Sequence, residues 1–439
     1  MSLSKQLVDW ALAQRAYGLD AAIERKTRLH CADNIGIAIA ARARSPIAGQ
    51  LRKALDGAEA LSPASFAFAA SAHSHMLDFD DVHDMARVHP TAVTMPAALA
   101  VLPLSSAGGR EVLEAVALSN ELACRLGMIW LPSGGGPGSD WFLTQLFGYF
   151  SAALSASLVL GLDAAQTQSA IGLAYMQAAG GKEAGVGAGG TARAIYPAFA
   201  AMGGVQAALL ARSGVQGPPT ALDGKAGFFH LYFGRQLDSG QTAQLLAPHG
   251  WFWQDTCFKL WPCCRHSHPY VVAAQALGAG VDVQNIERVV VRVNPTAAKL
   301  CTPIEQRRRP QTLQDAKYSI PFLVALALTR REVSLQSLDE SSLTDPQVLA
   351  VAQCVAIENT GHDEPGMPHA SITLTSRPEG AGRTFELPFA EPQGEDMLHT
   401  KFSACMAYAG WTPAQAAGMW ACVQALDVSG LEKIRGLMA

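Results

Sequence analysis

Acidic and imidazole side chains are concentrated in one short segment, residues 73–90, with the sequence HSHMLDFDDVHDMARVHP. It holds four aspartates and four histidines in eighteen residues, whereas charged residues make up only 16% of the chain. Because burying unpaired ionisable groups costs free energy, a fold that concentrates them beside an apolar stretch such as 94–102 usually needs them for binding or proton transfer. We expect the chemistry to occur here.

A second concentration of reactive side chains lies at residues 259–268, KLWPCCRHSH, and the two segments could form opposite walls of one pocket. Cys263, Cys264, His266 and His268 offer the atom types that bind zinc. Adjacent cysteines and an H-x-H step do not match the usual spacing of zinc ligands. We therefore expect no metal ion.

The elements that must position these groups change in character along the chain. Residues 1 to about 255 are Ala-rich with helical periodicity, and the apolar run 146–162 predicts a buried core helix that is too short and too polar for a membrane span. After residue 262 strands and helices mix, and residues 394–439 return to amphipathic helix. The predicted strands are 286–293, 370–375 and 384–387, and the predicted helices between them are 319–328 and 345–354.

Length and composition favour an enzyme-sized protein of two domains. The chain has 439 residues and a hydrophobic fraction of 49%, which supports a large core and an oligomer interface. A net charge of -4, with a single like-charged triplet at 307–309, argues against a nucleic-acid partner. The charged N-terminal segment, with Leu3, Leu7 and Ala11 at helical spacing, predicts a docked helix rather than an export signal. We expect a cytoplasmic protein without a membrane partner and with reduced cysteines.

The glycine-rich segment 185–190, GVGAGG, satisfies the G-x-G-x-x-G pattern of dinucleotide-binding turns. It follows a helical segment rather than a strand, and no βαβ unit surrounds it. We therefore expect no dinucleotide.

Five segments resemble, in order, motifs of the MmgE/PrpD family, which includes 2-methylcitrate dehydratase, cis-aconitate decarboxylase and iminodisuccinate epimerase. The resemblance extends over nearly the whole chain. The segments are LDFDDVH followed by HP and an apolar helix, 191–217, 259–268, DAKYSIP at 315–321, and 395–402.

This resemblance implies a mainly α fold, with an all-helical domain from residues 1–260 and 396–439 and a smaller α+β lid domain from 261–395. It also implies a cleft between the domains, a homodimer, and no metal or organic cofactor. The catalytic candidates are Asp78, His89, His268 and Tyr318, and the substrate-binding candidates are Arg193, Asp81, Lys259 and Phe142.

Three positions depart from the family pattern. Val82 stands where some members have Thr, Phe142 where several have an active-site His, and Arg193 where the decarboxylases have Lys. These departures bear on the substrate more than on the fold, and they count against cis-aconitate decarboxylation.

The candidate residues suit chemistry on a carbon next to a carboxylate. Arg193 can hold a carboxylate in a bidentate fork, and either His89 or His268 can be neutral near pH 7 and accept a proton. Asp78 could orient an imidazole or bind a substrate hydroxyl, and Tyr318 could donate a proton. The function predicted is dehydration of a small hydroxy polycarboxylate resembling 2-methylcitrate. Alternatives are an epimerase or decarboxylase on a related acid, or an inactive homologue that only binds a carboxylate.

Several of these side chains also have structural explanations. Asp80 and Asp81 could cap the following helix or pair with Arg87. His73, His75 and His83 are expected to be surface or structural residues. Tyr318 could be a core aromatic residue, Arg193 could belong to a structural ion pair, and Lys259 could be structural.

Overall fold

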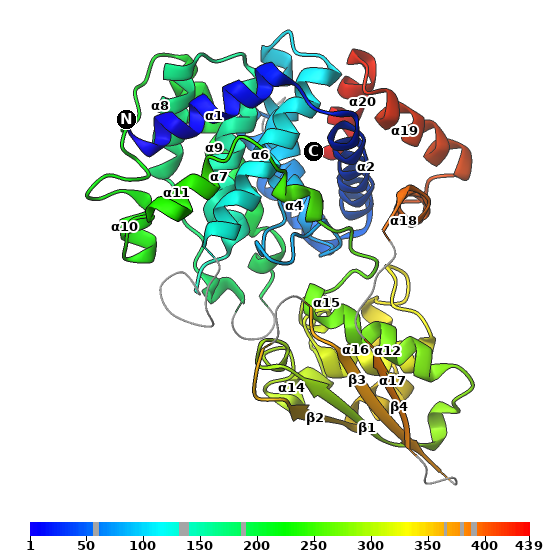
Figure 1. The fold of residues 1–439 in the computed structure, drawn as a ribbon. Helices are drawn as coiled ribbons and strands as arrows, with labels where there is room; N and C mark the ends of the chain where they lie inside the picture. The colour runs from blue at the N-terminus through cyan, green and yellow to red at the C-terminus, as the bar shows by residue number, and fades with distance from the viewer. Residues whose placement is uncertain (56–60, 131–139, 186–189, 364–366, 378–381, 388–392) are drawn as a thin grey trace. The chain divides into compact units, whose positions relative to one another are not determined.

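The computed structural model describes residues 1–55, 61–130, 140–185, 190–363, 367–377, 382–387 and 393–439. It contains two compact units, each with its own hydrophobic core (Figure 1). The first unit is helical and combines Met1–Ala184, Ala192–Phe258 and Gly394–Ala439, and the second includes Lys259–Gln393. The predicted fold class, mainly α with a smaller α+β part, is confirmed.

The helical unit is built from α-helices of different lengths, with a few short 3-10 turns between them. Its helices are α1 Leu3–Tyr17, α2 Ala21–Arg44, α3 Pro46–Leu55, α4 Pro63–His75, α5 Thr91–Val101, α6 Gly109–Ile129, α7 Leu143–Val159, α8 Ala164–Tyr175, α9 Tyr196–Arg212, α10 Phe228–Phe233, α11 Ser239–Leu245, α18 Glu395–Tyr408, α19 Pro413–Ala425 and α20 Val428–Met438. Its 3-10 turns are η1 Leu102–Leu104, η2 Lys182–Gly185, η3 Ala192–Ala194 and η4 Phe252–Asp255.

Helices α7 and α9 pack closely along one another at the centre of this unit. A Cβ atom at Gly204 of α9 would lie 2.4 Å from the Cβ of Ala152, so only glycine permits the approach. Every residue of α7 is buried, which confirms the predicted core helix. The packing brings together the N-terminal ends of the two helices, where the rings of Phe142 and Tyr196 stack. Among the described residues, no helix is long and apolar enough to cross a membrane.

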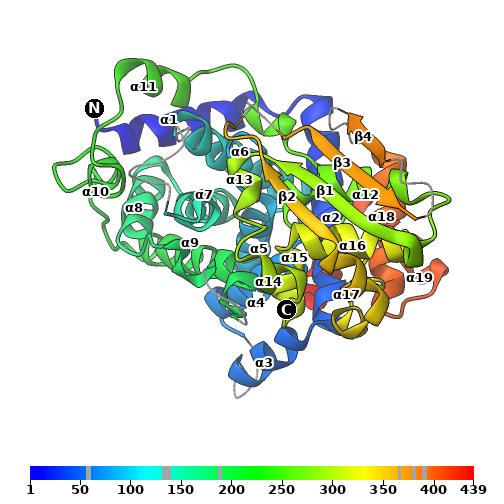
Figure 2. The ribbon, with the colours of Figure 1, turned by 90° about the horizontal axis from the view of Figure 1, so that it is seen from below.

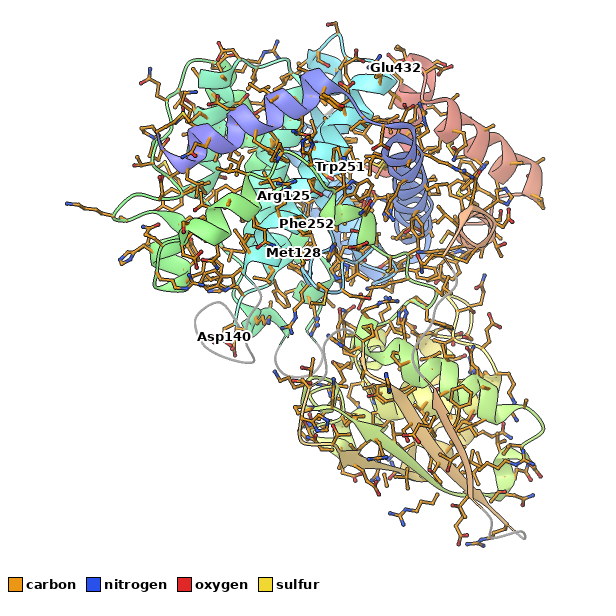
Figure 3. The ribbon with its side chains drawn as sticks, viewed as in Figure 1. Arg125, Met128, Asp140, Trp251, Phe252 and Glu432 are labelled. Carbon is orange, nitrogen blue, oxygen red and sulfur yellow. The ribbon has the colours of Figure 1, made fainter. Side chains whose placement is uncertain are left out.

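Arg125 of α6 fixes the chain that leads from α11 to η4. Its guanidinium bonds the carboxylate of Glu121 and donates to the carbonyls of Leu245, Ala247 and Gly250. Figure 3 labels Arg125 beside Phe252, whose ring its guanidinium also contacts. This anchoring carries the chain to Cys257, which pairs with the segment 73–90 as described below.

The second unit contains a four-stranded sheet in the order β2-β1-β3-β4. β1 runs parallel to β2 and antiparallel to β3, and β3 runs antiparallel to β4 (Figure 2). Val289, Val291 and Val293 of β1 alternate into the core that the helices complete. The elements are η5 Arg265–Ser267, α12 His268–Gly278, η6 Val283–Asn285, β1 Ile286–Val293, α13 Pro295–Ala298, α14 Ile304–Arg308, α15 Leu313–Lys317, α16 Ile320–Arg330, η7 Glu340–Thr344, α17 Pro346–Gln353, β2 Val355–Asn359, β3 Ala370–Ser376 and β4 Gly382–Leu387.

Candidate active site

Residues 76–90 form an irregular loop between α4 and α5 that is fixed at both its backbone and its side chains. Val82 and Cys257 exchange two backbone hydrogen bonds of 3.0 and 2.8 Å. Asp78 has a φ of 53°, in the left-handed region that a short polar side chain tolerates, and its N–H donates to the carbonyl of His75 at 2.7 Å. The loop can therefore hold its side chains in a defined arrangement.

Asp80 is fully buried and lies between two imidazoles. Its Oδ2 is 2.8 Å from Nδ1 of His75 and 3.5 Å from Nδ1 of His89. The two rings meet edge to face with centroids 5.1 Å apart. One carboxylate thus serves both imidazoles, in the arrangement that orients a histidine and stabilises its protonated form.

The carboxylate of Asp81 makes a second set of contacts, with residues other than His75 and His89. Its Oδ2 is 2.9 Å from Nδ1 of His30 on α2 and accepts a bond of 2.6 Å from the hydroxyl of Thr91 on α5. Asn120 of α6 donates to that hydroxyl at 2.9 Å. Neither aspartate caps α5, whose N-cap Pro90 has no side-chain bond, so the capping interpretation was wrong. The two carboxylates hold imidazoles instead.

His89 is oriented by the backbone as well as by Asp80. Its Nδ1 lies 2.7 Å from the carbonyl oxygen of Asp81, and its own backbone N–H donates to the hydroxyl of Thr144 at 3.0 Å. A carbonyl oxygen can only accept, so Nδ1 carries a proton. In neutral His89 the lone pair therefore lies on Nε2.

A buried ion pair supports the same loop from behind. Nζ of Lys401 on α18 lies 2.7 Å from a carboxylate oxygen of Asp33 on α2 and donates to the carbonyl of Phe79 at 2.7 Å. It also lies 4.0 Å from the centre of the Phe79 ring. Burial raises the pKa of Asp33 to about 7, against the lowering effect of Lys401. Lys401 thereby joins the returning C-terminal chain to the loop.

Arg193 and Phe142 meet at the start of α9. The guanidinium carbon of Arg193 lies 5.6 Å from the centre of the Phe142 ring, which stacks on Tyr196 at 4.3 Å. Tyr196 also contacts His75 edge to face at 4.8 Å, and its hydroxyl bonds the side chain of Thr144. Burial raises the pKa of Tyr196, so its hydroxyl stays protonated. A cationic group and an aromatic pair thus adjoin the two imidazoles.

Three predicted residues belong to the second unit: Lys259, His268 and Tyr318. Nη1 of Arg265 lies 3.3 Å from Nδ1 of His268, and a guanidinium can only donate. Neutral His268 therefore carries its proton on Nε2, the opposite of His89. The backbone carbonyl of Tyr318 accepts a bond of 3.0 Å from Arg307. The other predicted residues, Asp78, Asp81, His89, Arg193 and Phe142, all belong to the first unit.

One cluster of side chains has its donor atoms close enough together to hold a metal ion. Among the residues that the structure describes, the donor atoms of His75, Asp80 and His89 lie within 4.8 Å of one another, and Cys263, Cys264, His266 and His268 form no such group. Both imidazoles direct Nδ1 at Asp80, and Nδ1 of His89 also donates to a carbonyl. A cation here would have to displace that proton and its bond, so we assign no metal.

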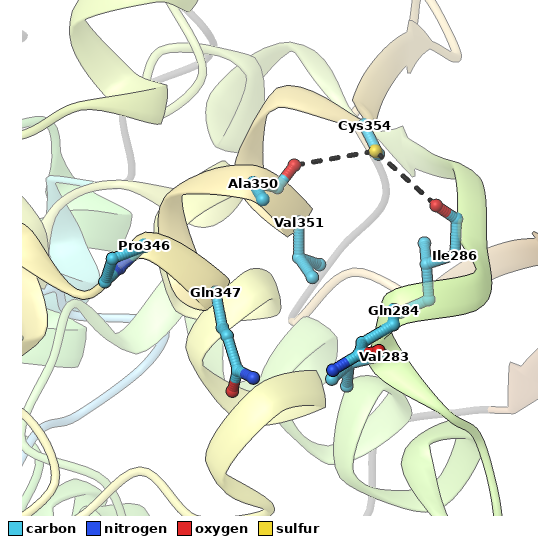
Figure 4. Close-up of a pocket in the computed structure, with 8 residues that line it drawn as sticks. All are labelled: Val283, Gln284, Ile286, Pro346, Gln347, Ala350, Val351 and Cys354. Atoms are coloured by element: carbon cyan, nitrogen blue, oxygen red, sulfur yellow. Dashed lines mark hydrogen bonds between the residues drawn. The ribbon is translucent and has the colours of Figure 1, made fainter.

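A cavity of about 260 Å³ lies in the second unit, between η6, the start of β1, and α17 (Figure 4). It is mostly apolar, and no predicted site residue lines it. The thiol of Cys354 can donate its single proton either to the carbonyl of Ala350 at 3.5 Å or to that of Ile286 at 3.8 Å. We do not connect this cavity with the chemistry.

Five main residues of this arrangement were not among the predicted ones: His30, His75, Asp80, Tyr196 and Lys401. Asp80 lies in the predicted segment, where it was considered as a helix cap or a partner of Arg87. His75 stood in the predicted segment. His73, His75 and His83 were expected to be surface or structural residues; all three are buried, which excludes the surface alternative. His73 and His83 bond the carbonyls of Met438 and Phe252, in agreement with the structural one. His30, Tyr196 and Lys401 lie on distant helices. For His30 a signal existed, because His30, Asp33 and Asn34 put three polar side chains on the buried part of α2.

Two family models match this chain, and several curated proteins are similar to it. The model of the MmgE/PrpD N-terminal domain matches residues 5–239, and that of the MmgE/PrpD C-terminal domain matches residues 261–417. The chain is 28% identical over 348 residues to the cis-aconitate decarboxylase-like protein oryM of Aspergillus oryzae, covering 73% of this chain and 69% of that protein. It is 26% identical to the cis-aconitate decarboxylase of Aspergillus terreus, covering 67% of this chain and 63% of that enzyme.

A third relative is the cis-aconitate decarboxylase of Homo sapiens, 26% identical over 366 residues, with 78% of this chain and 73% of the human protein covered. Of these three relatives, the A. terreus enzyme is matched over less than two thirds of its own length. The two family models together account for most of the chain, in the order of its two units. The chain belongs to the MmgE/PrpD family.

Proposed function

We propose that this protein is a lyase that dehydrates a small hydroxy polycarboxylate, without a metal or organic cofactor, by removing a proton from a carbon next to a carboxylate. The observation that carries the proposal is the orientation of His89. Its Nδ1 proton is held by the Asp81 carbonyl, which leaves the lone pair on Nε2. A neutral imidazole in this state is a proton acceptor.

The neighbours of His89 suit the proton transfer. When Nε2 takes the proton, the ring becomes a cation, and the Asp80 carboxylate 3.5 Å from Nδ1 stabilises that charge. The electron pair of the broken C–H bond first increases the negative charge on the substrate carboxylate. Arg193 holds that carboxylate with a charge-assisted pair of hydrogen bonds. The same electron pair then forms the C=C bond.

The hydroxyl must leave with a proton to become water. His268 is a candidate donor because its Nδ1 accepts from Arg265, so its proton is on Nε2. Tyr318 is the second candidate donor. Asp78 is proposed to bind the substrate hydroxyl, and Asp81 to act through His89 rather than on the substrate. We further propose a homodimer, which sedimentation of the purified protein tests directly.

Decarboxylation is the second candidate, since the curated relatives named above are cis-aconitate decarboxylases or similar to them. Two residues count against it. Phe142 stands where several family members have an active-site His, and its ring stacks on Tyr196. Arg193 stands where the decarboxylases have Lys, and an arginine cannot lose its proton as a lysine can. Decarboxylation also requires a proton donor at the substrate carbon, whereas neutral His89 offers a lone pair.

The test is incubation in deuterated water with citrate-like, methyl-substituted, malate-like and aminodicarboxylate acids and with cis-aconitate, followed by proton NMR. Loss of a C–H signal with formation of an alkene is the expected result. His89→Ala, Arg193→Gln and His268→Ala should each lower the rate, the first by about 10²-fold or more. His230→Ala, at an exposed imidazole on α10, is the control.

Other outcomes assign other functions. Release of carbon dioxide from cis-aconitate would establish a decarboxylase, and exchange with inversion but no alkene would establish an epimerase. Binding without exchange in any acid would indicate an inactive carboxylate-binding homologue.

A further inference from the structure

Asp81 is held in place by donors from two helices. Its buried carboxylate is bonded by Nδ1 of His30 at 2.9 Å and by the hydroxyl of Thr91 at 2.6 Å. Asn120 bonds the Thr91 hydroxyl, and its own Oδ1 accepts from Thr94 at 2.5 Å. The chain of bonds therefore fixes the carboxylate of Asp81 relative to α2, α5 and α6.

The same residue presents its backbone carbonyl to the proposed base. The Asp81 carbonyl oxygen is 2.7 Å from Nδ1 of His89. Side chain and carbonyl share one Cα, so restraint of the carboxylate limits rotation of the peptide group that follows it. The direction of this carbonyl decides which nitrogen of His89 carries the proton.

We propose that His30 is a positioning residue for His89: by fixing Asp81, it keeps the proton of neutral His89 on Nδ1 and the lone pair on Nε2. The inference rests on the proposed role of His89 as the base. His30 itself does not contact the substrate in this scheme.

The surroundings of His30 argue for a specific role rather than for simple filling of the core. Its ring lies 4.9 Å from that of Trp253 and 4.3 Å from that of Phe258, and it is fully buried. Within the described part of the chain, its Nε2 has no hydrogen-bond partner. Burial lowers the pKa of His30 to about 4, so it is neutral with one N–H, and this N–H is directed at Asp81.

An apolar side chain would fill this space without burying a polar nitrogen that has no partner. The imidazole therefore provides something that packing does not require, namely a donor aimed at Asp81. An asparagine could provide the same donor, because its Nδ2 takes nearly the position of the histidine Nδ1.

The test compares His30→Leu, which removes the donor, with His30→Asn, which keeps it. His73→Leu and His73→Asn are matched controls, because His73 is also buried, also bonds through Nδ1, and contacts the carbonyl of Met438 on α20. For all variants we would measure the thermal midpoint, kcat and KM, and the 15N shifts of the two ring nitrogens of His89.

In the wild-type protein we expect His89 to be protonated on Nδ1. His30→Leu should give a mixture of tautomers and lower kcat by about 10- to 100-fold with little change in KM. His30→Asn should restore both. The His73 variants should lose similar stability but keep kcat and the His89 shifts.

An unchanged His89 tautomer in His30→Leu would overturn the proposal, as would an equal loss of kcat in the His73 variants. The 15N measurement needs no substrate, so it separates this inference from the proposed function. A shifted tautomer in a protein that turns over none of the acids would support the positioning role and contradict the lyase.

Discussion

At the scale of single residues, Asp80 is the carboxylate on which both neighbouring imidazoles depend. His75 and His89 both direct Nδ1 at its Oδ2. An amide in its place would keep the shape but remove the charge that stabilises protonated His89, and its NH2 group could face an N–H. We therefore expect Asp80→Asn to lower kcat by about 10² to 10⁴-fold while substrate binding changes little. Steady-state rates would be compared with Asp84→Asn, a half-buried carboxylate of the same loop, and equal losses would contradict the role of Asp80.

A second expectation at this scale concerns metal ions. Because Nδ1 of His89 already donates to a carbonyl, we predict that treatment with a chelator leaves the rate unchanged. Dialysis against EDTA, followed by assay with and without added Zn²⁺ or Mg²⁺, provides the measurement. A loss of activity that the metal restores would show that His75, Asp80 and His89 are ligands.

The residues that the sequence made visible are those of one continuous segment. Residues 73–90 stood out because polar groups are dense there, and the structure places Nδ1 of His89 next to both the Asp80 carboxylate and the Asp81 carbonyl. His30 and Lys401 could not be assigned in this way, because their partners lie 51 and 322 residues away in sequence. Their roles depend on how α2 and α18 pack against the loop.

At the scale of helices and strands, α18 is joined to the loop of residues 76–90 by a buried pair. Lys401 neutralises Asp33 and bonds the carbonyl of Phe79. Without Lys401 the buried Asp33 loses its partner and must take up a proton to avoid an unpaired charge, and removing one member of a buried pair typically costs about 3 to 5 kcal/mol of unfolding free energy. We expect Lys401→Met to be strongly destabilised, and the double variant Lys401→Met with Asp33→Asn to recover most of the loss.

Urea denaturation of the two single variants and the double variant gives the coupling energy. If the double variant is as unstable as the sum of the single ones, the two side chains do not act as a pair. If the double variant instead recovers its stability, a change in its kcat reports the loss of the bond from Lys401 to the Phe79 carbonyl.

The elements themselves followed from the sequence to different degrees. β1 has the predicted bounds, because its β-branched residues alternate between core and surface. β2 was not predicted: its five residues, VAIEN, follow α17 almost directly and are only partly buried, so they carry no clear alternation. Its pairing is set by β1, which the local sequence does not show.

At the scale of the whole helical unit, two buried histidines make the free energy of unfolding depend on pH. His30 connects α2 to the loop, and His73 connects α4 to the last helix, α20. Burial lowers the pKa of each to about 4, whereas the unfolded chain titrates near 6.5. Between these two values the unfolded state binds more protons, so the folded state loses stability as pH falls.

The stability that the folded state has when both histidines are neutral is present in full above about pH 6.5. Roughly 3 kcal/mol of it is lost for each histidine as the pH falls to about 4. Asparagine at position 73 can keep the bond to the Met438 carbonyl but cannot take up a proton. We therefore expect His73→Asn to lower stability by a constant amount near pH 7 and to remove the share of the decline between pH 6.5 and 4 that belongs to His73, roughly 3 kcal/mol. Asp33, whose pKa burial raises to about 7, acts in the opposite direction in both proteins and so cancels in the comparison. Unfolding free energies measured at several pH values in this window give the slope, and a slope equal to that of the wild-type protein would mean that His73 is protonated as easily in the folded state as in the unfolded chain.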